Sequence, residues 1–266
     1  MNLIETIPII DAHAHVFAIP HYVNMLVKTM DTCHISKACI SGIGPIFQSI
    51  TNQQVLDLLQ TYPDRFIGAY FIRPGLSHPE EIQQAYSAGF RMIKVTLTVK
   101  PYDDEELFPL WEEAAHLHMP ILFHTGILTT PLAAPTEHIS SWKMHPMRLE
   151  PIANAFPQLN IIIAHLGVHW NEDAAELIRM RPNVYADLTG EPSGWRKRAD
   201  HIGMEHYLWW DGAFKKILFG TDVIPTKIPE ILQQDRARYQ RLHLDEETLH
   251  LIFHRNLEKM LHISTG

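Results

Sequence analysis

The sequence predicts a (β/α)₈ barrel, the TIM-barrel fold, built as a single domain over residues 1–266. Three observations predict it. Eight short apolar runs recur along the chain, starting roughly 30 residues apart, which is the length of one βα unit. Segments with helix signals separate these runs. The length of 266 residues is close to the ~250 residues typical of the fold.

Each apolar run is expected to form a strand that is buried on both faces. Nearly continuous Ile, Leu, Val and Phe, in place of a polar–apolar alternation, is what a parallel sheet covered by helices requires. The runs are PIID (8–11), KACI (37–40), FIGAYFI (66–72), RMIKVTL (91–97), PILFHTG (120–126), NIIIAHLG (160–167), NVYADLTG (183–190) and KILFGTD (216–222).

Helix signals lie between the runs. Residues 79–89 begin with Pro and two Glu and end with Gly, the usual punctuation of a helix. Residues 103–118 open with acidic groups, which suit a helix N-terminus, and contain Pro109, which is expected to split or kink the helix. Residues 145–158 and 246–261 carry apolar side chains at three- and four-residue steps.

Strands that alternate with helices are compatible with a closed barrel or with an open doubly wound sheet. An open sheet that binds a dinucleotide would show GxGxxG after its first strand. The first apolar run of this chain ends in DAHAH (11–15) instead. The barrel is therefore the favoured architecture.

Composition narrows the classes of partner. The formal net charge of −8 argues against nucleic acid, because binding along a phosphate backbone needs a basic face. We find no apolar run of ~18 residues, so no transmembrane helix and no membrane partner are expected. The N-terminus lacks a signal-peptide pattern, and Cys33 and Cys39 stand outside any CxxC pattern, as in a reducing compartment. We expect a cytoplasmic protein with a small-molecule substrate; a homo-oligomer is left open.

Polar groups at the ends of the runs predict a metal site. The C-terminal ends of barrel strands face one mouth, where active sites form. His13 and His15 end the first run and share one strand face, while His124, His165 and Asp222 end the fifth, sixth and eighth runs. A lone HxH pair fits a metal-free barrel mouth equally well, but five competent groups on four strands favour a metal.

The donor types suggest which ion would bind. Three imidazoles and one carboxylate suit Zn²⁺, Mn²⁺ or Fe²⁺ better than Ca²⁺ or Mg²⁺. Zinc is the leading expectation, since a catalytic zinc commonly takes about three protein ligands and leaves a position for water. One group must then accept and deliver protons, and Asp222 and His165 are the candidates.

Four strand-end motifs together resemble a known family. DAHAH, FHTG (123–126), AHLG (164–167) and FGTD (219–222) resemble those of the amidohydrolase superfamily. The resemblance is to its amidohydrolase-related branch (amidohydrolase 2), which includes the aminocarboxymuconate-semialdehyde decarboxylase-like proteins. It covers nearly the whole chain, including TYPDRFIGAYFIRPG at 61–75.

The resemblance implies a role for each strand-end group. His13 and His15 match the first-strand metal ligands, and His124 matches the fifth-strand ligand. Asp222 matches the eighth-strand carboxylate, which binds the metal and can take a proton from water. His165 matches a sixth-strand histidine that polarises the substrate or transfers protons.

Two further positions are ambiguous. Some superfamily members carry a carboxylated lysine on the fourth strand that bridges two metal ions. Lys94 is either such a bridge or a buried or mouth-facing cation, in which case it is a candidate to bind substrate. Asp11 precedes the histidine pair and is expected on the same face, where it either accepts a hydrogen bond that orients an imidazole or only ends the strand; the first is favoured.

Substrate contacts are predicted less sharply. Arg73 follows the third run and could bind a carboxylate as a bidentate fork, although a surface ion pair is an equal alternative. The long loop 127–146, with Trp142, is expected to line the pocket, because such loops set specificity. His169 and Trp195, after the sixth and seventh runs, are similar candidates.

Three functions follow from this sequence. The leading one is a metal-dependent hydrolase that activates water on a mononuclear divalent metal to attack an amide, lactone or ester. The alternative is a metal-dependent nonoxidative decarboxylase of a small carboxylic acid on the same ligand set. A non-catalytic binding barrel is the third, and it would predict decayed ligand positions.

Overall fold

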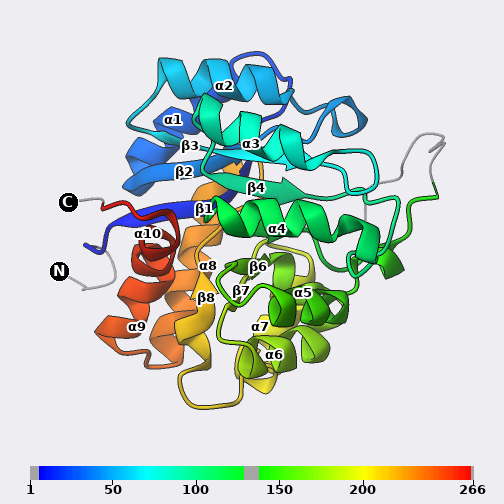
Figure 1. Ribbon diagram of the computed structural model, residues 1–266. Helices are drawn as coiled ribbons and strands as arrows, with labels where there is room; N and C mark the ends of the chain where they lie inside the picture. The colour runs from blue at the N-terminus through cyan, green and yellow to red at the C-terminus, as the bar shows by residue number, and fades with distance from the viewer. Residues whose placement is uncertain (1–5, 129–137, 265–266) are drawn as a thin grey trace.

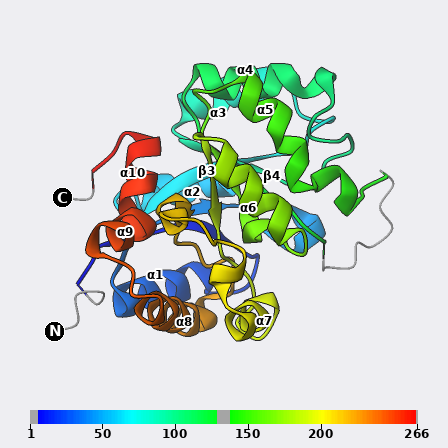
Figure 2. The same cartoon turned by 90° about the horizontal axis from the view of Figure 1, so that it is seen from below.

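Eight parallel strands, hydrogen-bonded in the order β1 to β8, form the centre of the molecule, and helices surround them (Figures 1 and 2). This computed structural model describes residues 6–128 and 138–264. The predicted (β/α)₈ barrel is confirmed. Part of the loop predicted to line the pocket, residues 129–137, lies outside the described residues.

Every apolar run of the sequence overlaps one strand. The first two strands extend beyond their runs, whereas the last five runs continue past their strands into polar tips at the mouth. The strands are β1 (Ile9–His15), β2 (Ile35–Ser41), β3 (Phe66–Ile72), β4 (Met92–Val95), β5 (Ile121–Phe123), β6 (Ile161–Ile163), β7 (Val184–Asp187) and β8 (Ile217–Leu218).

The α-helices pack on the outside of the barrel. Figure 1 shows both chain termini at the left, while the arrowhead of β4 points right, toward the end at which the strands finish. The helices are α1 (Tyr22–Cys33), α2 (Asn52–Thr61), α3 (Pro79–Ala88), α4 (Phe108–His116), α5 (Glu150–Ala155), α6 (Asn171–Met180), α7 (Trp195–Ile202), α8 (Ile228–Arg241), α9 (Glu246–His250) and α10 (Asn256–Leu261).

Three of the predicted helices are interrupted. The segment 145–158 begins with a 3₁₀ turn, Pro146–Leu149, that precedes α5. The segment 103–118 splits into a 3₁₀ turn, Glu105–Leu107, followed by α4, with Pro109 in the first turn of that helix. Proline is tolerated there because the first N–H groups of a helix have no intrahelical partner. The segment 246–261 contains a π-helical turn, Leu251–Arg255, between α9 and α10.

Two apolar cores flank the strands. The larger core lies between the strands and the outer helices. The smaller core fills the barrel interior with one side chain or more from most strands, including Ile10, Met92 and Leu122, and α10 packs against it through Leu257 and Met260. Since the interior is filled with side chains, the chemistry is confined to the mouth.

A β-bulge in β1 decides which residues of that strand face inward. The register with β2 pairs Asp11 with Ala38 but Ala14 with Ile40, so β1 carries one extra residue between these pairs. Ala12 belongs to the interior core, whereas Ala14 packs in the outer core. After Ala12 the bulge therefore exchanges the inward-facing and outward-facing positions of the strand. This exchange places the HxH histidines on the interior side.

Hydrogen bonds between β1 and the residues that directly follow β8 close the barrel. Ala12 N–H donates to the carbonyl of Phe219 at 2.9 Å, and Asp222 N–H donates to the carbonyl of His13 at 2.8 Å. The second bond fixes the backbone of Asp222 against the HxH segment. Two groups far apart in sequence are thereby held side by side.

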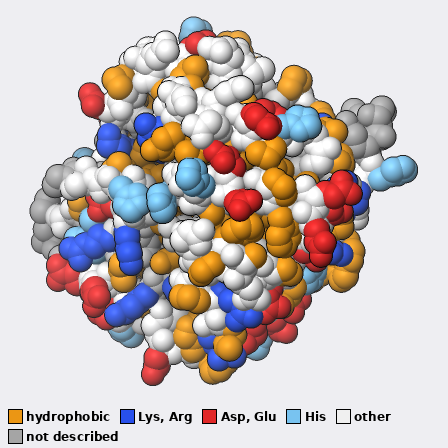
Figure 3. Space-filling model, in the orientation of Figure 1, with side chains coloured by type: hydrophobic (Ala, Val, Ile, Leu, Met, Phe, Trp, Pro, Cys, Tyr) orange, Lys and Arg blue, Asp and Glu red, His pale blue; other side chains and the backbone are white. Residues whose placement is uncertain are grey.

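The face of the molecule drawn in Figure 3 carries both charged and apolar side chains. On this face, basic and acidic side chains lie interspersed with apolar ones. Within the described ranges, no helix combines the length and the apolar character that crossing a lipid bilayer needs.

Candidate metal centre

Three predicted ligand atoms form a compact triangle at the mouth. His13 Nε2 lies 3.2 Å from His15 Nε2. Asp222 Oδ1 lies 3.8 Å from His13 Nε2 and 3.3 Å from His15 Nε2. A circle through three atoms at these separations has a radius of about 2.0 Å, which is the length of a zinc–nitrogen or zinc–oxygen bond. The three atoms therefore fit one first-row divalent cation.

His165 lies beside this triangle. It follows β6 in the left-handed region, with φ 59°, and its side chain is buried. Its Nε2 lies 3.7 Å from Asp222 Oδ2. One ligand atom each from His13, His165 and Asp222 all lie within 4.8 Å of one another. His165 can thus act as a further ligand or as a group that exchanges protons at the same place.

His124 follows β5 and touches the site through His165. Its Nδ1 lies 3.3 Å from His165 Nε2. Its Nε2 is buried and has no hydrogen-bond partner within the described part of the chain. A buried polar atom without a partner costs about 1–3 kcal/mol, which a bound ligand or ion would relieve. The predicted role of His124 as a metal ligand stays a prediction.

Burial keeps the histidines of the site neutral. It lowers the pKa of His13 to about 4, with Lys94 lowering it further and Asp187 opposing. Burial also lowers the pKa of His15 and of His124 well below the usual value. A metal ligand must be unprotonated to bind, so these imidazoles are ready to bind a cation at neutral pH.

The two charged groups that face the histidines are both perturbed. Burial raises the pKa of the Asp222 carboxyl, and His165 and Lys94 oppose the shift. Lys94, at the centre of β4, lies with Nζ 2.9 Å from His13 Nε2. Burial lowers the pKa of Lys94 to about 8. The structure thus places Lys94 at the ligand set, as both interpretations of this residue require.

Asp187, at the end of β7, orients two of the histidines, and the sequence interpretation did not single it out. Its Oδ2 accepts a hydrogen bond from His13 Nδ1 at 2.8 Å. Its Oδ1 accepts the backbone N–H of His165 at 2.8 Å. The first contact fixes the proton of His13 on Nδ1 and directs the lone pair of Nε2 into the triangle. The available signal was an aspartate at the tip of the seventh apolar run.

Asp11 has a different role from the one expected. The bulge in β1 separates it from the face of the HxH pair. Its carboxylate accepts the backbone N–H of His13 at 3.0 Å, and the N–H and hydroxyl of Thr221 at 3.0 and 2.6 Å. Asp11 therefore holds the backbone of the first and eighth strand ends, and the imidazole of His13 is oriented by Asp187 instead.

Two of the predicted substrate-binding residues line one pocket. His169 and Trp195 border a cavity of about 260 Å³ together with Arg198 and Tyr207. The indole of Trp195 donates to the carbonyl of Thr189 at 2.8 Å, which ties its ring to the end of β7.

The other two candidates lie elsewhere at the mouth. Trp142 is 58% exposed and packs its ring against His145 and Trp170. Arg73 donates from Nε and Nη2 to the carbonyl of Leu97, at 3.4 Å each, so its guanidinium lies against the segment that follows β4. Their predicted roles in substrate binding stay predictions.

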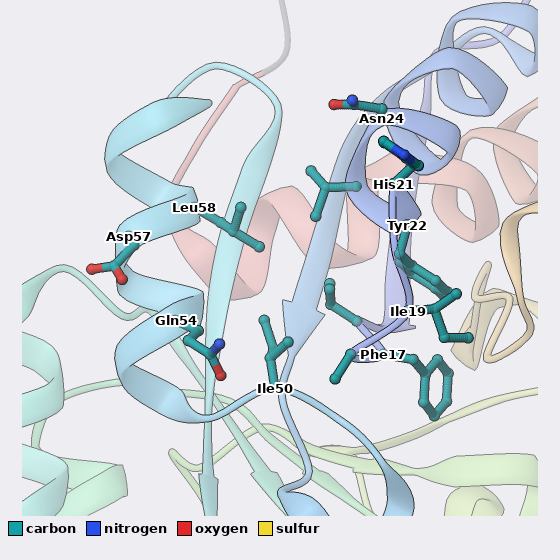
Figure 4. Close-up of a pocket in the computed structure, with 12 residues that line it drawn as sticks. Phe17, Ile19, His21, Tyr22, Asn24, Ile50, Gln54, Asp57 and Leu58 are labelled. Carbon is teal, nitrogen blue, oxygen red and sulfur yellow. The ribbon is translucent and has the colours of Figure 1, made fainter.

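A larger pocket lies outside the barrel, between α1 and α2 (Figure 4). It measures about 470 Å³ and is lined mainly by apolar side chains. Figure 4 shows Gln54 and Leu58 on the α2 side and Tyr22 on the α1 side. The hydroxyl of Tyr22 donates to the carbonyl of His15 at 3.0 Å, so the pocket shares a wall with the candidate metal centre.

A protein-family model described as amidohydrolase matches residues 44–263. The chain belongs to the amidohydrolase-2 family. The resemblance found in the strand-end motifs is therefore confirmed. A search of curated proteins finds no significant match.

Solved structures share the fold at low sequence identity. An uncharacterised TIM-barrel protein from Bordetella bronchiseptica is 18% identical, with a TM-score of 0.74, over 96% of this chain and 98% of its own. A probable 2-pyrone-4,6-dicarboxylic acid hydrolase from Acinetobacter baumannii, with citric acid bound, is 14% identical, with a TM-score of 0.67, over 96% and 99%. A 5-carboxyvanillate decarboxylase from Novosphingobium aromaticivorans, with manganese bound, is 16% identical, with a TM-score of 0.65, over 97% and 98%.

Proposed function

We propose that this amidohydrolase is a metal-dependent hydrolase that opens an amide, lactone or ester bond of a small molecule. The observation that carries the proposal is the triangle of His13 Nε2, His15 Nε2 and Asp222 Oδ1, whose separations fit one divalent cation. These residues would hold the cation, with His124 completing the set. A Zn²⁺, Mn²⁺ or Fe²⁺ ion held there would supply Lewis acidity to water and to a substrate carbonyl.

The protein groups of the site divide the proton transfers. Asp222 is the general base, because its Oδ1 belongs to the triangle while its Oδ2 lies outside it and is left to take up a proton. His165, with Nε2 at 3.7 Å from Asp222 Oδ2, is the second proton-transfer group. Lys94 is a cation at the same place and would attract a substrate with negative charge.

A nonoxidative decarboxylase is the second candidate. The fold is shared with a 5-carboxyvanillate decarboxylase as well as with a probable dicarboxylic acid hydrolase. A decarboxylase needs a cation to hold the carboxylate of its substrate, and Lys94 and Arg73 are the candidates for that group. Both candidate reactions, hydrolysis and decarboxylation, use a small substrate that contains a carboxylate or another carbonyl group.

Metal analysis of purified variants tests the ligand set. His13→Ala and Asp222→Asn should each lose most of the bound metal that the wild-type protein retains after dialysis. His116→Ala is the matched control, because His116 is exposed on α4. Full metal content in both ligand variants would refute the site.

Product analysis separates the two reactions. We expect incorporation of ¹⁸O from labelled water into a product when lactones, N-acyl compounds and aromatic carboxylates are screened. Release of CO₂ without incorporation of ¹⁸O would establish the decarboxylase instead. Wild-type protein that binds metal but shows neither reaction would leave the non-catalytic barrel as the function.

A further inference from the structure

Thr189 lies two residues after Asp187 and is fully buried. Its Oγ1 is 2.6 Å from Asp187 Oδ1 and 2.7 Å from His165 Nδ1. The Nδ1 of His13 is farther away, at 3.3 Å. The hydroxyl therefore bridges a carboxylate and the ring of His165, on the side of the ring that faces away from Asp222.

The proton of this hydroxyl is directed at Asp187. The 2.6 Å separation is the length of a charge-assisted O–H···O⁻ bond. The same Oδ1 of Asp187 also accepts the backbone N–H groups of His165 and Thr189, at 2.8 and 3.0 Å, so this oxygen already serves as an acceptor for two other donors. An ionised carboxylate can only accept hydrogen bonds, so Thr189 must be the donor.

The remaining contact of the hydroxyl then assigns the proton of His165. A hydroxyl has one proton, and that of Thr189 is already committed to Asp187. At 2.7 Å the oxygen can therefore only accept from His165 Nδ1. A neutral imidazole with its proton on Nδ1 carries a lone pair on Nε2. Nε2 is the nitrogen that faces the site, 3.7 Å from Asp222 Oδ2 and 3.3 Å from His124 Nδ1.

We propose that Thr189 is a positioning residue that holds His165 in its Nδ1-protonated form, so that an unprotonated Nε2 faces the substrate. Asp187 fixes the ring of His13 in the same way through a direct contact, so one carboxylate determines the proton positions of two site histidines. The consequence of this proton position for catalysis rests on the proposed function. His165 begins the reaction as a proton acceptor or cation ligand, and it can donate to a developing oxyanion only after it has gained a proton.

Nitrogen NMR of histidine-labelled protein tests this directly. Long-range ¹⁵N–¹H spectra distinguish a protonated ring nitrogen from an unprotonated one, and a His165→Gln variant assigns the signal. The wild-type protein, as purified and after addition of Zn²⁺, should show His165 protonated on Nδ1. Thr189→Ser keeps the hydroxyl and should give the same pattern, whereas Thr189→Val removes it at nearly equal volume and should shift the proton partly or wholly to Nε2.

Each outcome bears on the proposal. Protonation of His165 on Nε2 in the wild-type protein overturns it, as does an unchanged pattern in Thr189→Val. The wild-type spectrum decides the first point even if Thr189→Val fails to fold, and Thr189→Ala then serves as the second variant without a hydroxyl. With a substrate in hand, Thr189→Val should lower kcat by about 10- to 100-fold and leave KM within about 3-fold, with Thr189→Ser close to wild type. The expected spectra without any hydrolysis or decarboxylation would support the role of Thr189 and refute the proposed function.

Discussion

Thr221 donates two hydrogen bonds to the carboxylate of Asp11, one from its backbone N–H at 3.0 Å and one from its hydroxyl at 2.6 Å. Both residues are buried. Because Asp222 follows Thr221 directly, this pair fixes the chain at the point where the eighth strand end delivers its carboxylate to the metal centre. The contact links barrel closure to the geometry of the site.

Removal of the Thr221 hydroxyl should weaken both stability and metal binding. Thr221→Val leaves one buried oxygen of Asp11 short of a donor, and the free energy of unfolding should fall by about 1–3 kcal/mol. Zn²⁺ affinity should fall by about 10-fold, because groups that orient ligands affect metal affinity on this scale. Urea unfolding and Zn²⁺ titration measure the two effects. Thr221→Ser keeps the hydroxyl and should stay near wild type; equal losses in both variants would contradict the assignment.

Replacement of Lys94 should separate its two interpretations. An ammonium 2.9 Å from His13 Nε2 competes with a metal ion for that nitrogen. Lys94→Met should therefore raise Zn²⁺ affinity by about 10-fold or more, while Lys94→Arg, which keeps the charge, should not. The number of metal ions bound per protein tests the other interpretation. A fall from two ions in the wild-type protein to one in Lys94→Met would show that a carboxylated Lys94 bridges two metal ions.

Gly220 is required by close packing beside the site. A Cβ added there would meet Thr189 Cγ2 at 2.8 Å and His13 Cβ at 3.0 Å. Gly220→Ala should lower the free energy of unfolding by about 1–3 kcal/mol, the usual effect of overpacking, and reduce metal retention. Thermal unfolding and metal analysis check this. Gly194→Ala is the milder comparison, since its Cβ would meet the carbonyl oxygen of Glu191 at 3.3 Å, a tight but longer approach. A Gly220→Ala protein that loses no more stability than Gly194→Ala would argue against the predicted clash.

A histidine chain on the C-terminal helices should contribute to acid sensitivity. His250 Nδ1 lies 2.9 Å from His254 Nε2, and Glu246 lies 3.7 Å from the other ring nitrogen of His250. Burial, followed by the charges of Arg255 and His254, lowers the pKa of His250 below 6.5, while Glu246 opposes. Below pH 6.5 the unfolded chain then binds more protons than the folded one, so stability falls with falling pH.

His250→Gln should remove part of this dependence. Its free energy of unfolding, measured in urea at pH 7 and pH 5, should fall less between the two than that of the wild-type protein. His116→Gln changes an exposed histidine on α4 and should behave like wild type. If the stability of His250→Gln falls between pH 7 and pH 5 as much as that of the wild-type protein and of His116→Gln, His250 does not contribute to the acid sensitivity.

The barrel was predictable because buried parallel strands have continuous apolar sequences, and each of the eight apolar runs overlaps a strand. The convergence of His13, His15 and Asp222 followed from the rule that strand ends share one mouth. The role of Asp11 was not predictable in this way. Strict alternation placed it on the face of the histidines, and the bulge that separates them depends on pairing with a second strand.

The contributions of Asp187 and Thr189 to the site were also not predictable from the sequence. Metal ligands can be recognised by residue type and position, whereas a residue that orients a ligand is recognised by what it touches. The contacts of Asp187 with His13 and His165 join positions 174 and 22 residues apart in the chain. A sequence pattern alone carries no distance between them.

Two side chains of the candidate centre stand on left-handed backbone, at φ 59° for His165 and 49° for Asp222. Such a conformation costs a residue with a Cβ about 1–2 kcal/mol, and the bonds from their N–H groups to Asp187 and to the His13 carbonyl hold it in place. Glycine, which lacks a Cβ, would adopt this backbone conformation at either position without that steric cost. An engineer who optimises this barrel for heat resistance should therefore exclude positions 165 and 222 from the search, because the substitutions that relax the main chain there are the ones that erase the chemistry.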